Sequence, residues 1–214
     1  MAIKASKTTC MLCKSKYTER GMSKHLKTCL PKRLDKALNS PTAEHQSFFH
    51  ILVRGYYLPE YWLHLTVDKN AELGDLDQFL RDIWLECCGH LSAFFLKENE
   101  IKMSEKVGNI LKPGMELQHH YDFGSTTELQ VKVLAEYSGP MKNNGFIQIL
   151  ARNEAPEIPC RLCGKAPAAY VCTACQWNGT GWLCQSCAEE HECGDEILLP
   201  VLNSPRTGVC GYEG

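Results

Sequence analysis

Two segments in the middle of the chain place an apolar residue at every second position. These segments run from Tyr61 to Asp68 and from Leu129 to Tyr137. A period of two sends successive side chains to opposite faces and is typical of a β-strand. We therefore predict strands at about 61–68 and 129–137, the second closed by Ser138-Gly139-Pro140.

Between these segments the apolar spacing changes to three and four residues. Leu76, Phe79, Leu80, Ile83 and Trp84 follow this helical spacing, which predicts an amphipathic helix over about 74–88 that ends at a glycine. Shorter apolar runs at 91–97 and 146–149 predict further strands. A strand, a helix and then several strands indicate an α+β domain with a mixed or antiparallel sheet.

Cysteine is unusually frequent, at 13 of 214 residues, and six cysteines form three C-x2-C pairs with eight residues between consecutive pairs. A C-x2-C step directs two thiolates to one side and suits tetrahedral Zn²⁺. The expected ligands near the C-terminus are Cys160, Cys163, Cys172, Cys175, Cys184, Cys187, His191 and Cys193. We predict that this region folds around two zinc ions.

The spacing leaves two arrangements of these ligands open. In a cross-brace, which resembles the interleaved treble-clef, B-box and MYND fingers, the first and third pairs share one ion, and the second pair joins His191 and Cys193. In a sequential arrangement the first two pairs share one ion. Cys210 is an alternative to Cys193, because His191-x-Cys193 is a short step.

A further ligand set near the start of the chain resembles a C2HC zinc finger. It consists of Cys10, Cys13, His25 and Cys29, and the last two lie one helical turn apart. We expect a helix around 23–29 that stops at Pro31, a small core of Tyr17 and Leu26, and a linker over 31–45. A segment this small needs a metal ion to fold.

Charge is distributed unevenly along the chain. Residues 1–36 hold ten Lys and Arg against two acids, a formal charge of +8, while the remainder carries −10. This asymmetry favours an anionic partner for the finger, such as DNA, RNA or a ribonucleoprotein. The candidate nucleic-acid contacts are Lys14, Lys16, Arg20, Lys24 and Lys27.

Several classes of protein lack their sequence signals here. The N-terminus has no apolar segment typical of a secretion signal, and no stretch approaches the ~20 apolar residues of a membrane span. We therefore expect a cytoplasmic protein with reduced thiols. The sequence contains neither a P-loop nor a Gly-x-Ser-x-Gly motif. Zinc sites with four protein ligands are structural, which argues against a zinc hydrolase.

The segment from His119 to Asp122 is the remaining candidate for acid–base chemistry. Strand alternation would place His119 and Tyr121 on one face, and His120 and Asp122 on the other. Packing and hydrogen bonding in or near the sheet is the favoured explanation of these residues. Asp122 precedes Phe123-Gly124 and suits a turn. We interpret Cys87 as a core residue at the end of the helix and Cys88 as flanking it.

Three stretches of the central region carry a family resemblance. They are the Trp62-containing strand, the run Gly89–Phe94, and Tyr121-Asp122-Phe123-Gly124. In this order they resemble the pRiA plasmid ORF-like family, whose proteins carry insertion-element passenger or resolvase labels. The resemblance implies an α+β domain, sometimes followed by a cysteine-rich tail. The chain departs from the family pattern at Ser92 and over 125–128, which weakens any site built on those positions.

Together these features predict a protein in three parts: a basic zinc finger at 1–36, an α+β domain at 37–153 and a binuclear zinc domain at 154–214. We expect about three zinc ions per chain. The favoured function is a binding or adaptor protein with a nucleic-acid-binding finger and a protein-binding C-terminal domain. Two alternatives stay open: a purely structural adaptor, and a nucleic-acid-processing enzyme or hydrolase with a site near His90, His119 and Asp122.

Overall fold

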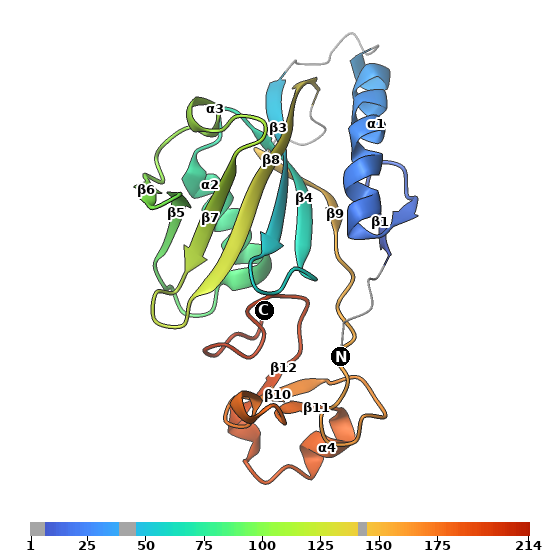
Figure 1. Ribbon diagram of the computed structural model, residues 1–214, viewed down its shortest axis with the longest axis vertical. Helices are drawn as coiled ribbons and strands as arrows, with labels where there is room; N and C mark the ends of the chain where they lie inside the picture. Colours follow the sequence, from blue (N-terminus) through green and yellow to red (C-terminus); the bar gives the residue numbers. More distant parts are fainter. Residues whose placement is uncertain (1–6, 39–45, 141–144) are drawn as a thin grey trace.

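A seven-stranded antiparallel sheet forms the centre of the protein (Figure 1). The computed structural model describes residues 7–38, 46–140 and 145–214. The strands lie in the order β6-β5-β7-β8-β3-β4-β9. Their bounds are β3 Gln46–Gly55, β4 Trp62–Asp68, β5 Ser92–Leu96, β6 Asn99–Ile101, β7 Glu116–Tyr121, β8 Thr127–Gly139 and β9 Ile147–Arg152. The prediction of an α+β fold is confirmed, and the sheet is antiparallel.

Both faces of the sheet are covered. Alternate residues of β4 and its neighbours pack on one side against α2 (Leu73–Leu80), which continues as a π-helical turn over Arg81–Leu85. The other side packs against α1 (Glu19–Leu38), which lies beside β4 and β9 in Figure 1. All seven residues of β4 are therefore buried, including the face whose sequence is largely polar.

The interior strand β3 has no counterpart among the predicted strands. Residues 48–53 are all buried, because α1 covers one face of the strand and α2 the other. A strand buried on both faces reads as a continuous apolar run and lacks the alternation that marks a half-exposed strand. The strands predicted at 61–68, 91–97, 129–137 and 146–149 correspond to β4, β5, β8 and β9.

Helix α1 continues through Pro31 and ends at Leu38, so the prediction that it stops at the proline is wrong. Proline removes one backbone hydrogen bond from a helix interior. Leu26, Leu30 and Leu34 are buried against the sheet on both sides of the proline. Burying each leucine stabilises the fold by ~1.5–3 kcal/mol, which offsets the lost bond. Of the predicted linker at 31–45, residues 39–45 lie outside the described ranges.

The predicted helix over 74–88 is shorter than expected. It begins at Leu73 after a reciprocal capping box between Glu72 and Asp75, and the π-helical turn ends it at Leu85. Cys87 and Cys88 therefore lie beyond the helix, in a loop before β5. A short helix α3 (Val107–Ile110) lies between β6 and β7.

Two smaller sheets lie outside the central one. Strands β1 (Thr8–Thr9) and β2 (Lys16–Tyr17) form a hairpin beside α1. The C-terminal unit, residues 154–202, contains a three-stranded sheet in the order β11-β10-β12 (Figure 1). Its elements are β10 Tyr170–Cys172, a 3-10 turn Gln176–Asn178, β11 Trp182–Leu183, α4 Gln185–Glu189, a 3-10 turn Asp195–Ile197 and β12 Leu198–Pro200.

After β12 the chain returns to the lower end of the central sheet (Figure 1). We call residues 203–214 the C-terminal tail. Asn203 and Asn153 exchange hydrogen bonds, and the Ser204 hydroxyl donates to the Trp84 carbonyl at 2.5 Å. The tail thus packs against the central region although its sequence follows the cysteine-rich unit. None of the helices in the described residues has the length and apolarity that a membrane crossing requires.

Candidate metal centres

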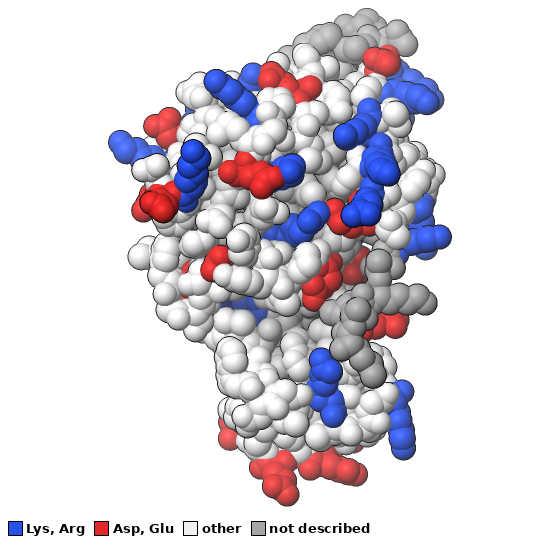
Figure 2. All heavy atoms as spheres, in the orientation of Figure 1, with Lys and Arg blue, Asp and Glu red and all other residues white. Residues whose placement is uncertain are grey.

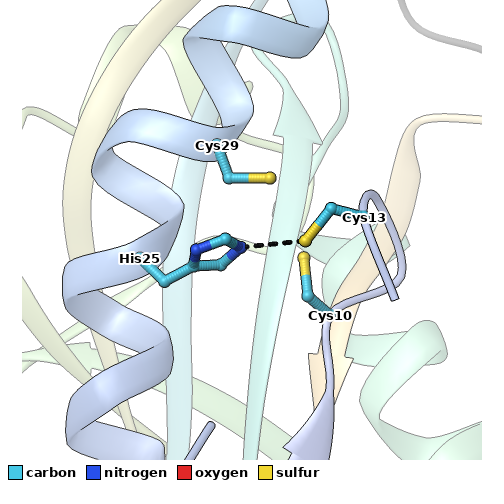
Figure 3. A group of neighbouring side chains, drawn as sticks. All are labelled: Cys10, Cys13, His25 and Cys29. Carbon is cyan, nitrogen blue, oxygen red and sulfur yellow. Dashed lines mark hydrogen bonds between the residues drawn. The ribbon is translucent and has the colours of Figure 1, made fainter. Parts of the chain in front are cut away.

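The four ligands predicted in the N-terminal finger point toward one another (Figure 3). Cys10 and Cys13 come from the loop after β1, while His25 and Cys29 project from one side of α1. The Cys13 Sγ lies 3.2 Å from the His25 Nε2. The Tyr17 ring stacks on the His25 ring with centroids 4.2 Å apart and fixes its orientation.

The loop between Cys10 and Cys13 has the backbone of a tight knuckle. The Lys14 amide donates to the Cys10 carbonyl at 2.8 Å, and Lys14 has a φ of 65°. Gly164, which follows the first C-terminal pair, repeats both features with a φ of 64° and a 3.0 Å bond to the Cys160 carbonyl. The two chain segments therefore present their cysteine pairs in the same way.

The finger is attached to the central sheet at two points. The Met11 amide donates to the Leu150 carbonyl on β9 at 2.8 Å, and the Thr8 hydroxyl donates to the Arg152 carbonyl. Cys10 is fully buried in the apolar cluster that α1 shares with the sheet. The small core predicted for the finger is thus part of a larger one, in which Leu26 is buried and Tyr17 lies at the margin.

The C-terminal ligands gather into two interleaved groups. One contains Cys160, Cys163, Cys184 and Cys187, and the other contains Cys172, Cys175, His191 and Cys193. This is the grouping of the cross-brace arrangement, and Cys193 rather than Cys210 completes the second group. Strand β10 ends at Cys172, and Cys184 caps α4, so the small sheet and helix place ligands from both groups.

Distances within these groups suit a tetrahedral ion. The ligand atoms of each group all lie within 4.8 Å of one another. Cys163 and Cys184 place their sulfurs 3.7 Å apart, and the Cys175 sulfur is 3.5 Å from the His191 Nε2. A tetrahedron with Zn–S bonds of ~2.3 Å has edges of about 3.8 Å. These groups could therefore hold metal ions without rearrangement.

Thiols within the finger group have opposed acidities. A hydrogen bond with Ser15 lowers the pKa of Cys13 to about 6. Burial, together with the neighbouring Cys10 thiol, raises the pKa of Cys29 to about 12. Several adjacent thiolates repel one another unless a cation lies between them, so a bound ion would release protons from the group.

A fourth group of the same kind was not predicted from the sequence. It joins Cys87, Cys88 and His90, in the loop before β5, with Cys210 of the C-terminal tail. The interpretation of Cys87 as a core residue and Cys88 as flanking is therefore incomplete, because both sulfurs face this group. The sequence contains one signal for this group, the number of cysteines. The three predicted ligand sets leave three cysteines over, and a histidine lies two positions after one of them.

With this group included, each of the 13 cysteines belongs to a four-ligand group. Three groups have three cysteines and one histidine, and one has four cysteines. No pair of cysteines in the described residues forms a disulfide. All cysteines of this chain therefore lie in groups that could hold a metal ion.

The five predicted nucleic-acid contacts of the finger are exposed. Lys14, Lys16, Arg20, Lys24 and Lys27 form no ion pair within residues 7–38, 46–140 and 145–214. Figure 2 shows basic side chains gathered along the side of the molecule that α1 occupies, and among the acidic side chains a group at the lower end of the molecule. The acidic end belongs to the C-terminal unit, as comparison with Figure 1 shows.

A hollow of about 340 Å³ adjoins the finger ligands. Its lining includes Cys13, His25 and Cys29, and beyond them Lys32, Arg33 and Lys36. Positions 25, 29, 32 and 36 recur at helical spacing and share one face of α1. The sequence did not single out the last three cations, because a helix ending at Pro31 would have left them in a linker.

Of the residues proposed for acid–base chemistry, His90 and Asp122 lie 3.6 Å apart, whereas His119 pairs with Asp77. His119 is fully buried, and its Nε2 lies 2.7 Å from Asp77. His90 instead lies 2.9 Å from the Cys88 sulfur. Asp122 accepts hydrogen bonds from the Gly124 and Ser125 amides, as its expected turn role requires, and a hydrogen bond from Arg206 lowers its pKa to about 2.

No family model matches the chain, and no curated protein matches it. One similar solved structure is described as a protein of unknown function, MM3350, from Methanosarcina mazei Go1. It is 15% identical, with a TM-score of 0.41, and the alignment covers 52% of this chain and 69% of that chain.

Proposed function

We propose that this chain is a zinc-binding protein whose N-terminal finger contacts nucleic acid. Sets of three cysteines and one histidine, or of four cysteines, are the ligands of structural zinc. Thiolate-rich tetrahedral groups select zinc over magnesium, calcium or manganese, which prefer oxygen ligands. Four protein ligands leave no position for a reactive water, so the zinc ions would maintain the fold rather than catalyse a reaction.

The observation that carries the nucleic-acid proposal is the distribution of cations around α1. Arg20, Lys24 and Lys27 occupy helical positions that share one exposed face. Cations without intramolecular partners attract polyanions at long range, and each phosphate contact releases a counterion. Their spacing along a rigid helix suits a phosphate backbone better than a single small anion.

The hollow beside the finger ligands extends this surface. Lys32, Arg33 and Lys36 line it together with Thr28, whose hydroxyl donates to the His25 carbonyl at 3.0 Å. A concave site with three cations suits one phosphate group, and the exposed cations on the adjoining face would contact the next phosphates. Such contacts position a protein on nucleic acid and carry little sequence information, so we expect weak sequence preference.

Binding to labelled single-stranded RNA and to duplex DNA, followed by fluorescence anisotropy over a salt series, tests the proposal. We expect affinity to fall steeply with salt. Replacing Lys24 and Lys27 with glutamine should weaken binding and reduce the slope of log K against log[salt] by roughly one unit for each lost contact. Comparison of the two probes shows which nucleic acid is preferred.

A matched control replaces Lys102 and Lys112 with glutamine, because both are exposed lysines of the central region. This variant has the same net charge as the finger variant and should bind like the parent chain. Equal losses in both variants would indicate a non-specific charge effect. Salt-insensitive binding, or no binding to either probe, would refute the proposal.

The C-terminal unit is proposed to contact a protein partner. Trp177 is 81% exposed, and Leu162 is 55% exposed. Large exposed apolar side chains on a small unit favour a protein contact. Replacing Trp177 with serine should reduce the amount of a co-purifying protein, measured by quantitative mass spectrometry, while nucleic-acid affinity stays unchanged. An unchanged set of co-purifying proteins would contradict this second contact.

The resemblance of the central region to the pRiA plasmid ORF-like family stays a prediction. An enzymatic site at His90, His119 and Asp122 receives no support from the geometry. His119 contacts Asp77 in the interior, whereas His90 and Asp122 lie near the C-terminal tail.

A further inference from the structure

We propose that Cys87, Cys88, His90 and Cys210 bind a fourth zinc ion, which fastens the C-terminal tail to the central region. This inference is independent of nucleic-acid binding by the finger. It concerns residues that are far apart in the sequence, because Cys88 and Cys210 are separated by 122 positions. The zinc ion would join the loop before β5 to the C-terminal tail, two segments that are far apart along the chain.

The distances among the four ligand atoms match those of the other groups. The Cys88 sulfur lies 3.7 Å from the Cys87 sulfur and 3.5 Å from the Cys210 sulfur. The His90 Nε2 lies 2.9 Å from Cys88 and 3.5 Å from Cys210. A disulfide bond joins sulfurs ~2.05 Å apart, so these separations correspond to the edges of a coordination tetrahedron instead.

The local backbone directs these side chains toward one point. The chain leaves the π-helical turn at Leu85, and Gly89 adopts a φ of 76°. The Gly89 amide donates to the Glu86 carboxylate at 2.6 Å, which holds the turn that brings His90 back toward Cys88. On the tail, Cys210 has a φ of 57°, an uncommon conformation for a residue with a side chain. Both segments are therefore shaped around the site.

Neighbouring charges suit a zinc-thiolate centre. Three thiolates, one neutral imidazole and Zn²⁺ carry a net charge of −1. The Arg206 guanidinium, which pairs with the Asp122 carboxylate, also lies 3.5 Å from the Cys87 sulfur and can donate a hydrogen bond to it. A cationic donor beside a thiolate ligand is typical of protein metal sites.

The position of the site explains what the ion would do. The C-terminal unit is attached at its beginning through β9 and at its end through the tail. Polar contacts of Asn203, Ser204 and Arg206 hold the start of the tail, and Cys210 lies beyond them. A zinc ion at Cys210 would close this second attachment and hold the cysteine-rich unit at both ends.

This site is more accessible than the other three. Cys88 and Cys210 are both exposed, whereas each of the other groups contains at least one buried cysteine. An exposed centre exchanges its ion with chelators more readily than a buried one. We therefore expect the fourth zinc to leave first, with release of the tail and retention of the other ions.

Elemental analysis and native mass spectrometry of the full chain, purified with zinc and a reductant, test the proposal. The parent chain should hold about four zinc ions. The double variant Cys88→Ser, Cys210→Ser should hold one fewer. The control Leu91→Ser changes a neighbouring side chain that is 77% exposed and should keep the parent stoichiometry. Hydrogen exchange of residues 203–214 should rise in the double variant and not in the control.

A second measurement does not depend on the variant folding. Stepwise addition of a chelator to the parent chain should remove one zinc before the others, together with faster exchange at 203–214. Peptide mapping without reductant then distinguishes a metal site from a Cys88–Cys210 disulfide. A parent chain with only three ions, an unchanged stoichiometry in the double variant, or a disulfide in the zinc-loaded protein would overturn the proposal.

Discussion

The Arg206 guanidinium lies 2.6 Å from the Asp122 carboxylate, and it joins the C-terminal tail to the central sheet. The arginine is fully buried, and its other amino group donates to the Ser125 carbonyl and the Thr127 hydroxyl at 3.0 Å each. The guanidinium also stacks over the Tyr121 ring, 4.8 Å from the centroid. One side chain of the tail therefore pairs with a buried carboxylate and donates hydrogen bonds to the turn that follows it.

Replacing Arg206 with methionine should destabilise the protein by ~3–5 kcal/mol, because it leaves the buried Asp122 carboxylate without a charged partner. Chemical denaturation measures this loss, and hydrogen exchange should show release of the tail. The second change Asp122→Asn should recover part of the loss, since it removes the uncompensated charge. Arg161→Met is the matched control, because Arg161 is exposed and forms no ion pair in the described residues. Equal stability of the two methionine variants would contradict this role for Arg206.

The sequence was informative wherever one physical signal dominated. Alternation located β4 and β8, and the C-x2-C spacing located three ligand groups that the fold brings together. These signals are local, because they depend on residues within one strand or one knuckle. The cross-brace and sequential arrangements have the same local spacing, so only the folded chain distinguishes them.

The remaining features depend on contacts between distant segments. Strand β3 lacks an alternation of polar and apolar residues because α1 covers one of its faces. Helix α1 continues beyond Pro31 because Leu34 packs on the sheet. The group at Cys87 and Cys210 forms only when the tail returns to the central sheet. No local sequence pattern predicts that the tail packs against the central sheet. The three cysteines outside the predicted ligand sets were the one indication of this contact in the sequence.

Replacing Pro31 with alanine should stabilise the protein by about 1–2 kcal/mol. A helix-interior proline costs ~3 kcal/mol, and part of this is returned because proline restricts the unfolded chain. Alanine restores the backbone donor to the Lys27 carbonyl, one turn earlier in α1. Thermal or chemical unfolding measures the change. The control Asp35→Ala alters an exposed position on the same helix and should have a smaller effect. A loss of stability in Pro31→Ala would show that the proline is required for the course of α1.

The pair of buried histidines between α1 and the sheet should make the fold sensitive to mild acid. The His50 Nε2 lies 2.9 Å from the His64 Nδ1, and Ser23 of α1 lies 3.2 Å from the His64 Nε2. Burial lowers the pKa of His50 to about 4 and holds the pKa of His64 well below its usual value. An unfolded histidine has a pKa of about 6.5, so the unfolded chain binds more protons below this pH.

Stability contributed by neutral His50 and His64 is therefore complete above pH ~6.5 and is lost as the pH falls toward 4. Each histidine adds a slope of up to about 1.4 kcal/mol per pH unit in this window. Chemical denaturation at pH 7.5, 6.5 and 5.5 measures the free energy of unfolding of the parent chain and of His50→Gln. The metal ligands contribute equally to both proteins, so their contribution cancels when the two free energies are subtracted. The matched control is His120→Gln, which changes a histidine outside the pair. Parallel pH profiles for the parent and His50→Gln would refute the assignment.

Removal of metal should unfold the C-terminal unit and leave the central sheet folded. The main core of the sheet contains 21 buried residues in the described ranges, whereas the cluster in the C-terminal unit contains Cys172, Leu183 and Ala188. A core that small cannot compensate the entropy of ordering the unit, so bound ions must supply the difference. Hydrogen exchange with excess chelator and reductant should show loss of protection across β10–β12 and retained protection in β3, β4 and β8. Re-addition of Zn²⁺ should restore the lost protection, and Mg²⁺ is the matched control because it prefers oxygen ligands. Full protection of β10–β12 without metal would mean that the cysteine groups are not required for the fold.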